Sequence, residues 1–275
     1  MIEIPEAATL AHHLGDALGD ARVDEVVAGH SPHKWAWFHG EPADYGPLLR
    51  GRTVAGAQSH GGFVEVDLGG ATIYFAEGVV LRLSGTDEDP PAKHQLLITF
   101  ADGRRLSASV RMYGGLWACP SGAFDNPYFE QARIKPSPLA PGFDRAYFDG
   151  LVGAPDVQKH SVKALLATEQ RIPGLGNGVL QDILYEARLH PRRKVETLTA
   201  DEQARAFEAV RVTLANMARQ GGRDTEKDLF GQAGGYRTRL SRNTLGQPCA
   251  RCGGTIEKAQ YLGGAVYFCA GCQEL

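Results

Sequence analysis

The hydrophobic positions near the start of the chain recur with the spacing of an amphipathic helix. Leu10, Leu14 and Leu18 lie four residues apart, and Pro5 suits a first helical turn. The opening segment MIEIPE therefore predicts a chain that enters a helix almost at once and buries one face of it.

From about residue 22 to residue 118 the pattern changes to short alternating or apolar runs. Two pairs of runs flank glycine-containing turns: Phe63–Leu68 with Ala71–Phe75, and Gln95–Ala101 with Arg104–Val110. Each pair predicts a β-hairpin, and several strands at this spacing predict an antiparallel sandwich or barrel. The aromatic-rich segment 31–40 (SPHKWAWFHG) is more typical of a packing loop than of a binding site.

The second half of the chain has helical periodicity. Prolines are frequent from residue 120 to residue 150, which favours an interdomain connection. Helices are predicted at His160–Ala167, Gly178–Ala187 and Ala200–Gln220. We expect an α+β protein with a helix and sandwich in residues 1–135, a linker in 136–150, a helical domain in 151–245 and a cysteine module in 246–275.

One turn of the helical half has the character of an anion site. The segment QRIPGLGN (170–177) contains a proline and two glycines, and Asn177 occupies the position of an N-cap for the helix that follows. Such a turn directs free backbone amides and a side-chain amide at one point, which suits a phosphate. The alternative is a helical hairpin that only packs.

Charge is distributed unevenly along a chain whose net charge is −3. From Leu151 onward there are 17 basic and 13 acidic residues, whereas the preceding part holds 12 and 19. The positive second half is compatible with a nucleic-acid partner, although basic clusters are more often solvated faces. No apolar run of membrane length and no leader pattern is present, so we expect a cytoplasmic protein.

Four of the five cysteines form two pairs near the end of the chain. Cys249 and Cys252, and then Cys269 and Cys272, have the spacing of a structural zinc site with four thiolate ligands. A closed site of this kind holds structure and leaves no position open for catalysis. We expect one Zn²⁺ there, while Cys119 lies outside the pattern.

Taken together, these segments resemble the formamidopyrimidine-DNA glycosylase and endonuclease VIII family of base-excision repair enzymes. The resemblance covers nearly the whole chain and rests on MIEIPE, KHQLLITFADGRRL (93–106), VRMYGGLW (110–117), QRIPGLGN, LYEARLHP (184–191) and the four cysteines. It implies an N-terminal helix with a β-sandwich, a helix–two-turn–helix domain and a zinc finger. It also implies a monomer that binds damaged duplex DNA in the cleft between the two domains.

The resemblance assigns roles to particular residues. Asn177, with the backbone at Gly176, would grip a DNA phosphate beside a flipped nucleotide. The segment Arg111–Tyr113 would fill the space left by that nucleotide, although Met112 and Tyr113 could instead simply end a core strand. Glu3 and Glu6 match the two glutamates of the family, of which the first donates protons to the sugar. A helix-start carboxylate is the alternative for Glu3.

Three positions depart from the family pattern. The family's nucleophile is the amine of an N-terminal proline, but position 2 is Ile2, and we expect Met1 to be retained because its removal generally requires a small second residue. The free amine is then displaced by one residue, about 3.8 Å between Cα atoms. Gly62 replaces a catalytic lysine and Gly264 replaces a phosphate-clamping arginine, for which Arg237, Arg239 or Arg242 could substitute.

Three functions remain open from the sequence. The first is a DNA glycosylase with altered chemistry, in which Glu3 activates water or the Met1 amine attacks, with or without strand cleavage. The second is a protein of the same fold that binds DNA damage with little or no catalysis. The third is a zinc-ribbon module for contacts with RNA or protein.

Overall fold

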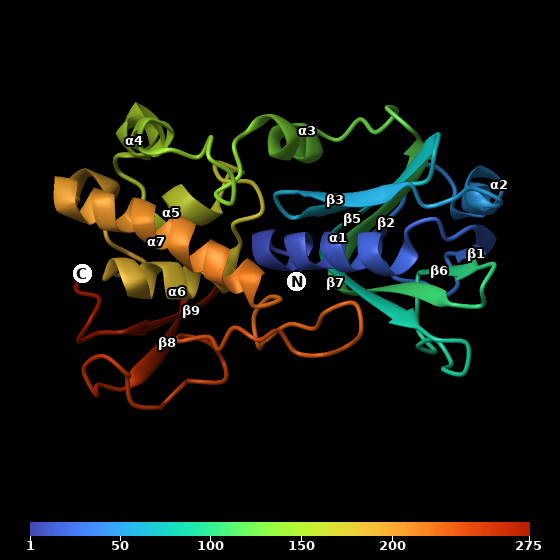
Figure 1. Cartoon of the computed structure of the whole chain (residues 1–275). Helices are drawn as coiled ribbons and strands as arrows, with labels where there is room; N and C mark the ends of the chain where they lie inside the picture. Colours follow the sequence, from blue (N-terminus) through green and yellow to red (C-terminus); the bar gives the residue numbers. More distant parts are fainter.

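The computed structural model describes residues 1–275, which form two halves that meet at the N-terminus (Figure 1). In the first half, helix α1 (Ile4–Leu18) lies along a seven-stranded sheet. Its strands are β1 (Val23–Ala28), β2 (Ala36–Trp37), β3 (Gly56–His60), β4 (Phe63–Asp67), β5 (Ala71–Ser84), β6 (Leu96–Phe100) and β7 (Arg105–Pro120). Two short helices, η1 (Pro42–Asp44) and α2 (Tyr45–Leu49), connect β2 to β3.

The sheet bends where its two longest strands lose their register. The strand order is β1-β6-β7-β5-β4-β3, and β2 joins β7 in parallel. Pairing between β5 and β7 shifts between Glu77 and Val79, so that residues 111–113 bulge out opposite Gly78. A Cβ atom at position 78 would lie 2.4 Å from the Tyr113 carbonyl oxygen, which explains the glycine. Because a bulge bends and twists a strand, the two parts of the sheet face each other as a sandwich.

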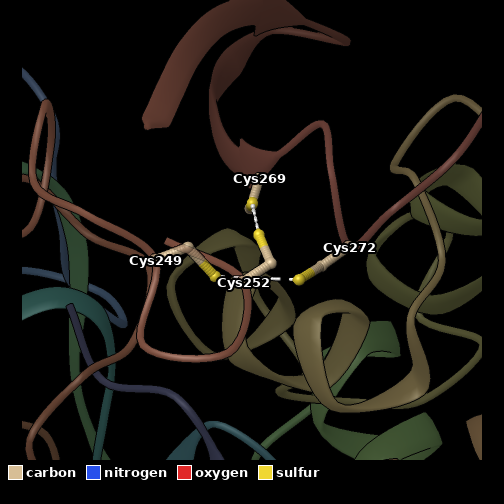
Figure 2. A group of neighbouring side chains, drawn as sticks. All are labelled: Cys249, Cys252, Cys269 and Cys272. Atoms are coloured by element: carbon tan, nitrogen blue, oxygen red, sulfur yellow. Dashed lines mark hydrogen bonds between the residues drawn. The ribbon is translucent and has the colours of Figure 1, made fainter. Parts of the chain in front are cut away.

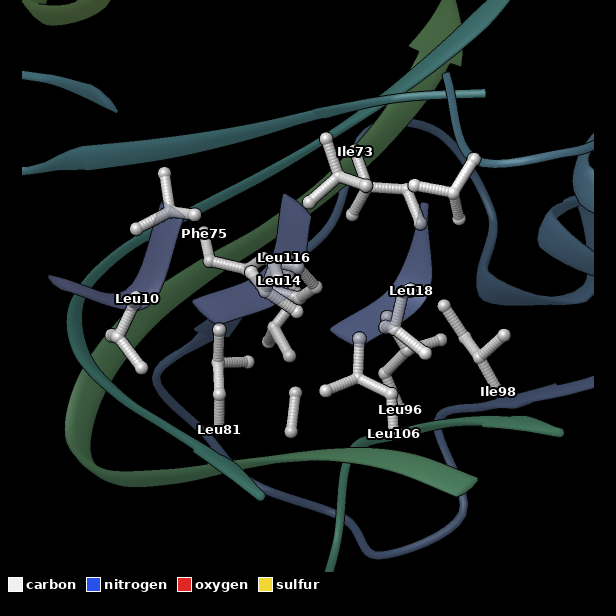
Figure 3. Close-up of a cluster of buried hydrophobic side chains, with 14 of the residues drawn as sticks. Leu10, Leu14, Leu18, Ile73, Phe75, Leu81, Leu96, Ile98, Leu106 and Leu116 are labelled. Carbon is white, nitrogen blue, oxygen red and sulfur yellow. The ribbon is translucent and has the colours of Figure 1, made fainter. Parts of the chain in front are cut away.

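The core of the first half includes the apolar face of α1 that the sequence predicted. Leu10, Leu14 and Leu18 are all buried between the two parts of the sheet, where they contact aliphatic and aromatic side chains of the strands (Figure 3). Full burial of one such side chain contributes about 1.5–3 kcal/mol. The position of α1, and with it the first residues of the chain, is therefore fixed by the sandwich.

Helices make up most of the second half. They are α3 (Pro127–Ile134), α4 (Arg145–Gly153), η2 (Pro155–Val157), α5 (Val162–Ala167), α6 (Asn177–Ala187), η3 (Val195–Thr197) and α7 (Ala200–Arg219). The chain ends in an antiparallel hairpin of β8 (Ile256–Tyr261) and β9 (Gly264–Cys269), which lies below α6 in Figure 1. We call residues 246–275 the finger.

Helices α4 to α7 share a second hydrophobic core, while α3 packs on the sandwich. The segment 136–150, which we expected to be a linker, is in part structured. Helix α4 begins at Arg145, and Phe143 and Phe148 are fully buried in the second core. The prolines of this region had masked a short helix whose N-cap, Asp144, accepts a hydrogen bond from the Tyr147 amide.

A loop from the second half reaches back into the first. Residues 224–236, which we call the strap, follow α7 and close on themselves where the Asp224 amide donates to the Tyr236 carbonyl oxygen at 2.8 Å. At its tip, Leu229 is completely buried in the sandwich core, and its carbonyl oxygen accepts a hydrogen bond from the Leu83 amide at 2.9 Å. The strap thus ties the two halves together.

The predicted fold class is confirmed. The N-terminal helix, both predicted hairpins and the three predicted helices are all present. No helix is both long enough and apolar enough to cross a membrane.

Leu229→Ala should lower the free energy of unfolding by about 2–5 kcal/mol, because it leaves a cavity in the sandwich core. Urea denaturation measures this change. Leu245→Ala is the matched control, since the Leu245 side chain is 46% exposed and its loss should change stability by less than about 0.5 kcal/mol. Equal effects of the two substitutions would show that the strap is not anchored through Leu229.

Candidate functional site

The carboxylate of Glu3 binds the N-terminus of α6 from across the molecule. Its two oxygens accept hydrogen bonds from the amides of Gly178 at 2.9 Å and Val179 at 2.7 Å. These are amides that a helix cannot satisfy internally, and the positive end of the helix dipole favours a negative group there. Glu3 is therefore a capping group for a helix that begins about 175 residues later in the chain.

Arg223 joins Glu3 to Glu6 in a buried ion cluster. The Arg223 guanidinium lies 3.4 Å from the Glu3 carboxylate and forms two hydrogen bonds with the Glu6 carboxylate, at 2.9 and 2.8 Å. All three side chains are almost inaccessible to solvent. Burial disfavours the charged guanidinium, but Glu3 and Glu6 together outweigh it and raise the pKa of Arg223. Burial raises the pKa of Glu3, while Arg223 and the two helix amides counteract this effect.

The chain terminus lies beside this cluster. The Met1 amine forms an ion pair with Glu226 of the strap, with 2.5 Å between nitrogen and oxygen. The next nitrogen, that of Ile2, is an ordinary amide that donates to the Glu77 carbonyl oxygen at 2.7 Å. The Ile2 side chain is buried in the sandwich core. The Met1 nitrogen is thus an amine paired with Glu226, whereas the Ile2 nitrogen is committed to a backbone hydrogen bond.

Close backbone contacts explain the glycines around the two turns. The β3–β4 turn meets the turn before α6, where a Cβ atom at Gly61 would lie 2.7 Å from the Pro173 carbonyl oxygen and one at Gly174 would lie 2.2 Å from the Gly62 amide nitrogen. Both Gly61 and Gly174 also have a positive φ, which favours glycine. The backbone of Gly174 therefore lies directly against position 62, where the family pattern has a lysine.

The amide side chain of Asn177 connects α6 to the finger. Its nitrogen donates to the Ala265 carbonyl oxygen at 2.7 Å, and its oxygen accepts from the Lys163 ammonium at 2.8 Å. Lys163 also donates to the Tyr261 carbonyl oxygen at 2.7 Å. The prediction that Asn177 is an N-cap is wrong, because Gly176 is the N-cap residue and Asn177 begins the helix. The capping interaction comes from Glu3, which local sequence reasoning did not consider.

A cavity of about 150 Å³ lies between α6, the strap and the finger. Its lining includes Asn177, Gly178, Arg223, Glu226, Arg242 and Tyr267. It thus combines the α6 N-terminus with the residue that holds the Met1 amine. No local sequence pattern marks Lys163, Arg223 or Glu226, because each has a partner far away in the sequence. Of the candidate arginines, Arg242 lines this cavity, whereas Arg239 lines a separate cavity along α7.

Arg111, Met112 and Tyr113 form the bulge of β7. Arg111 is exposed and the Met112 side chain is 61% exposed, so the bulge presents these side chains to solvent instead of ending a buried strand. Tyr113 is half-buried, and its hydroxyl group lies close to the Glu77 carboxyl group. Glu77 also supplies the carbonyl oxygen that binds the Ile2 amide, so the bulge adjoins the chain terminus.

The four cysteine sulfurs of the finger lie within 4.8 Å of one another (Figure 2). The sulfurs of Cys249 and Cys272 are 3.7 Å apart, and those of Cys252 and Cys269 are 3.4 Å apart. A tetrahedral zinc with bonds of about 2.3 Å places its sulfur ligands about 3.8 Å apart, so the cluster fits this ion. All four sulfurs would serve as ligands, and the role of the metal would be structural.

Comparisons with known proteins agree on one family, although no family model matches the chain. This chain is 32% identical over 209 residues to a formamidopyrimidine-DNA glycosylase from Pelotomaculum thermopropionicum, and the alignment covers 72% of this chain and 74% of that protein. It is 27% identical to the same enzyme of Listeria innocua over the full length of both chains.

Solved structures agree with this result. The crystal structure of the MutM (Fpg) protein from Thermus thermophilus matches with a TM-score of 0.81 at 26% identity over 98% of each chain. The Lactococcus lactis Fpg, solved in complex with DNA that contains an abasic site, matches with a TM-score of 0.83 over 99% of this chain and all of that chain. At 22% identity, this second likeness establishes the shared fold.

We expect one zinc per chain and expect Cys252→Ser to reduce the zinc content, because it removes one of four ligands. Chelation or this substitution should also increase amide hydrogen exchange in β8 and β9, since metal binding stabilises such fingers. Metal analysis and exchange measurements test both points. Cys119→Ser is the control that should retain the metal, and an unchanged finger after complete chelation would contradict the prediction.

Arg223→Met should lower the free energy of unfolding by about 3–5 kcal/mol, because it leaves two buried carboxylates without their shared cation. Arg219→Met, at the exposed end of α7, is the matched control with little expected effect. Adding Glu6→Gln to Arg223→Met should restore part of the loss, as measured by a double-mutant cycle. Additive losses in the double variant would show that the two side chains are not coupled.

Proposed function

This chain belongs to the formamidopyrimidine-DNA glycosylase family, and from that premise we propose that it is a DNA glycosylase of base-excision repair acting on damaged duplex DNA. The observation that carries the proposal is the position of the Met1 amine. Glu226 holds this amine and also lines the cavity at the α6 N-terminus, so a reactive nitrogen lies beside a site suited to a phosphate. The protein would act as a monomer with a structural zinc ion.

We assign the binding of the DNA backbone to the second half of the chain. Asn177 uses one amide hydrogen and one oxygen lone pair on protein partners, so it still has capacity to donate to a phosphate. Lys163 supplies positive charge at the same point, and Arg242 lines the neighbouring cavity in place of the missing finger arginine. The Glu3 carboxylate is fully engaged with α6 and Arg223, and we assign it to positioning this helix instead of activating water.

For the chemical step we propose that the Met1 amine attacks C1′ of the damaged nucleotide. The glycosidic bond breaks, and the base leaves with the bonding electron pair and takes up a proton. The nitrogen gives up protons, the first to Glu226. The C1′–O4′ bond then breaks, O4′ leaves with the bonding electron pair and takes up a proton, and the nitrogen lone pair forms the Schiff base between Met1 and C1′. The reactive nitrogen here is one residue further along the backbone than a proline at position 2 would place it.

A second candidate function is recognition of damaged DNA without catalysis. Ile2 at the nucleophile position and Gly62 at the lysine position favour it, because both remove groups on which the chemistry of the family depends. The two candidates share the same DNA grip and differ in the reactivity of the Met1 amine.

Borohydride should trap a covalent adduct between the protein and duplex DNA that contains an abasic site. Glu226→Gln should slow its formation by about a hundredfold, because the amine loses its proton acceptor. The protein must first be shown by intact mass to begin with a free Met1. Adduct yield against time, resolved by denaturing electrophoresis, is the measurement.

Two controls locate the reaction. Glu25→Gln changes an exposed carboxylate on β1 and should leave the trapping rate unchanged. A Gly-Ser extension before Met1 moves the amine away from Glu226 and should abolish trapping while DNA binding persists. No adduct and no base release across a panel of lesions, with duplex DNA still bound, would establish the second candidate instead.

A further inference from the structure

The aromatic segment 31–40 is not a packing loop at its centre. The Trp35 side chain is 50% exposed and that of Trp37 is 40% exposed, whereas Tyr45 and Phe75 of the same half are fully buried. Burying an indole ring is strongly favourable, so two exposed tryptophans two residues apart require an explanation. The expectation that this segment serves packing is therefore wrong for these two side chains.

The fold brings these tryptophans to the bulge of β7. Strand β2 pairs in parallel with β7, with Trp37 opposite Gly115, and the Gly114 amide donates to the Trp35 carbonyl oxygen at 2.9 Å. The ring centroids of Trp37 and Tyr113 are 5.8 Å apart. We call Trp35, Trp37, Met112 and Tyr113 the aromatic platform.

The aromatic platform contacts Glu77, which in turn connects it to the chain terminus. The Tyr113 hydroxyl group lies close to the half-buried Glu77 carboxyl group, and burial raises the pKa of that carboxyl group. The Glu77 backbone binds Ile2, the residue next to the Met1 amine. A continuous set of contacts thus leads from the proposed nucleophile through Glu77 and Tyr113 to Trp37.

The charge around the platform suits a phosphate backbone. The first 150 residues carry a net charge of −7, yet segments 26–40 and 103–124, which build the platform, contain no acidic residue. The Lys34 ammonium lies 4.9 Å from the centre of the Trp35 ring, and Arg111 is exposed on the bulge. Neither of these two cations forms an ion pair within the protein.

We propose that the aromatic platform binds unpaired bases, so that single-stranded DNA is a ligand of this protein in its own right. Exposed aromatic rings beside free cations are the combination that binds single strands, because each base stacks on a ring while its phosphate meets a positive charge. In an intact duplex the faces of the bases are covered by their neighbours and cannot reach the rings. The inference rests on the proposed function for the class of ligand, but it concerns a different surface from the α6 cavity.

The test compares two DNA forms on the full-length protein. Anisotropy of a labelled 15-nucleotide single strand should show that Trp35→Ala/Trp37→Ala weakens binding about tenfold, since stacking contributes of that order per base. Binding of a duplex with an abasic site should change less than twofold. Trp35→Phe/Trp37→Phe should retain most single-strand affinity, because phenylalanine still stacks.

Two further measurements separate stacking from a general loss of folding or charge. Tyr128→Ala removes an aromatic side chain that is 61% exposed on α3 and should leave both affinities unchanged. The protein has three tryptophans, so in a Trp117→Phe background the single strand should quench the fluorescence of the platform alone.

The outcomes are distinct for the two proposals. Unchanged single-strand affinity in the double alanine variant, or the absence of quenching, overturns the proposal that the aromatic platform binds single-stranded DNA. The exposed aromatic rings would then be a contact surface for a protein partner. Loss of borohydride trapping with single-strand binding still dependent on Trp35 and Trp37 overturns the catalytic proposal and supports the platform.

Discussion

The ion cluster of Glu3, Glu6 and Arg223 determines how the two halves of this protein are placed. Two carboxylates share one guanidinium, which would leave a net negative charge in a buried site. The N-terminus of α6 supplies the missing positive potential, equivalent to about half a charge, through the two amides that bind Glu3. Glu3 and Glu6 lie at the start of α1, and Arg223 immediately precedes the strap. The first helix, α6 and the base of the strap are therefore held at one point.

The same ion cluster also limits which groups near the chain terminus are available to a substrate. Glu3 cannot leave the α6 amides without exposing buried donors, so its freedom to act on a substrate is small. The group that we propose to be reactive is therefore the Met1 amine, whose ion-pair partner is Glu226 of the strap. Because Leu229 anchors the strap in the sandwich core, the group that holds the amine is fixed by hydrophobic packing on the opposite half of the molecule.

Local patterns in the sequence predicted the helices and strands, but they did not predict the contacts between residues that are distant in the sequence. The helical stripe of α1, the hairpins around glycine turns and the paired cysteines are all encoded within a few tens of residues. Arg223 meets Glu6 across 217 positions and Met1 meets Glu226 across 225, so no local pattern marks either pair. The prediction for Trp35 and Trp37 was wrong because closely spaced aromatic residues are buried only where the fold covers them, and here both side chains remain exposed.

Gly62 and the first residues of the chain pack together where the two halves meet. A Cβ atom at residue 62 would lie 3.3 Å from the Gly174 Cα, which is a tight contact, and 3.4 Å from the Ile2 carbonyl oxygen, which is an ordinary one. Beside this contact, Ile2 is buried in the sandwich core and its amide donates to the Glu77 carbonyl oxygen. With Ile2 held in this way, the Met1 amine is the group that meets Glu226 of the strap.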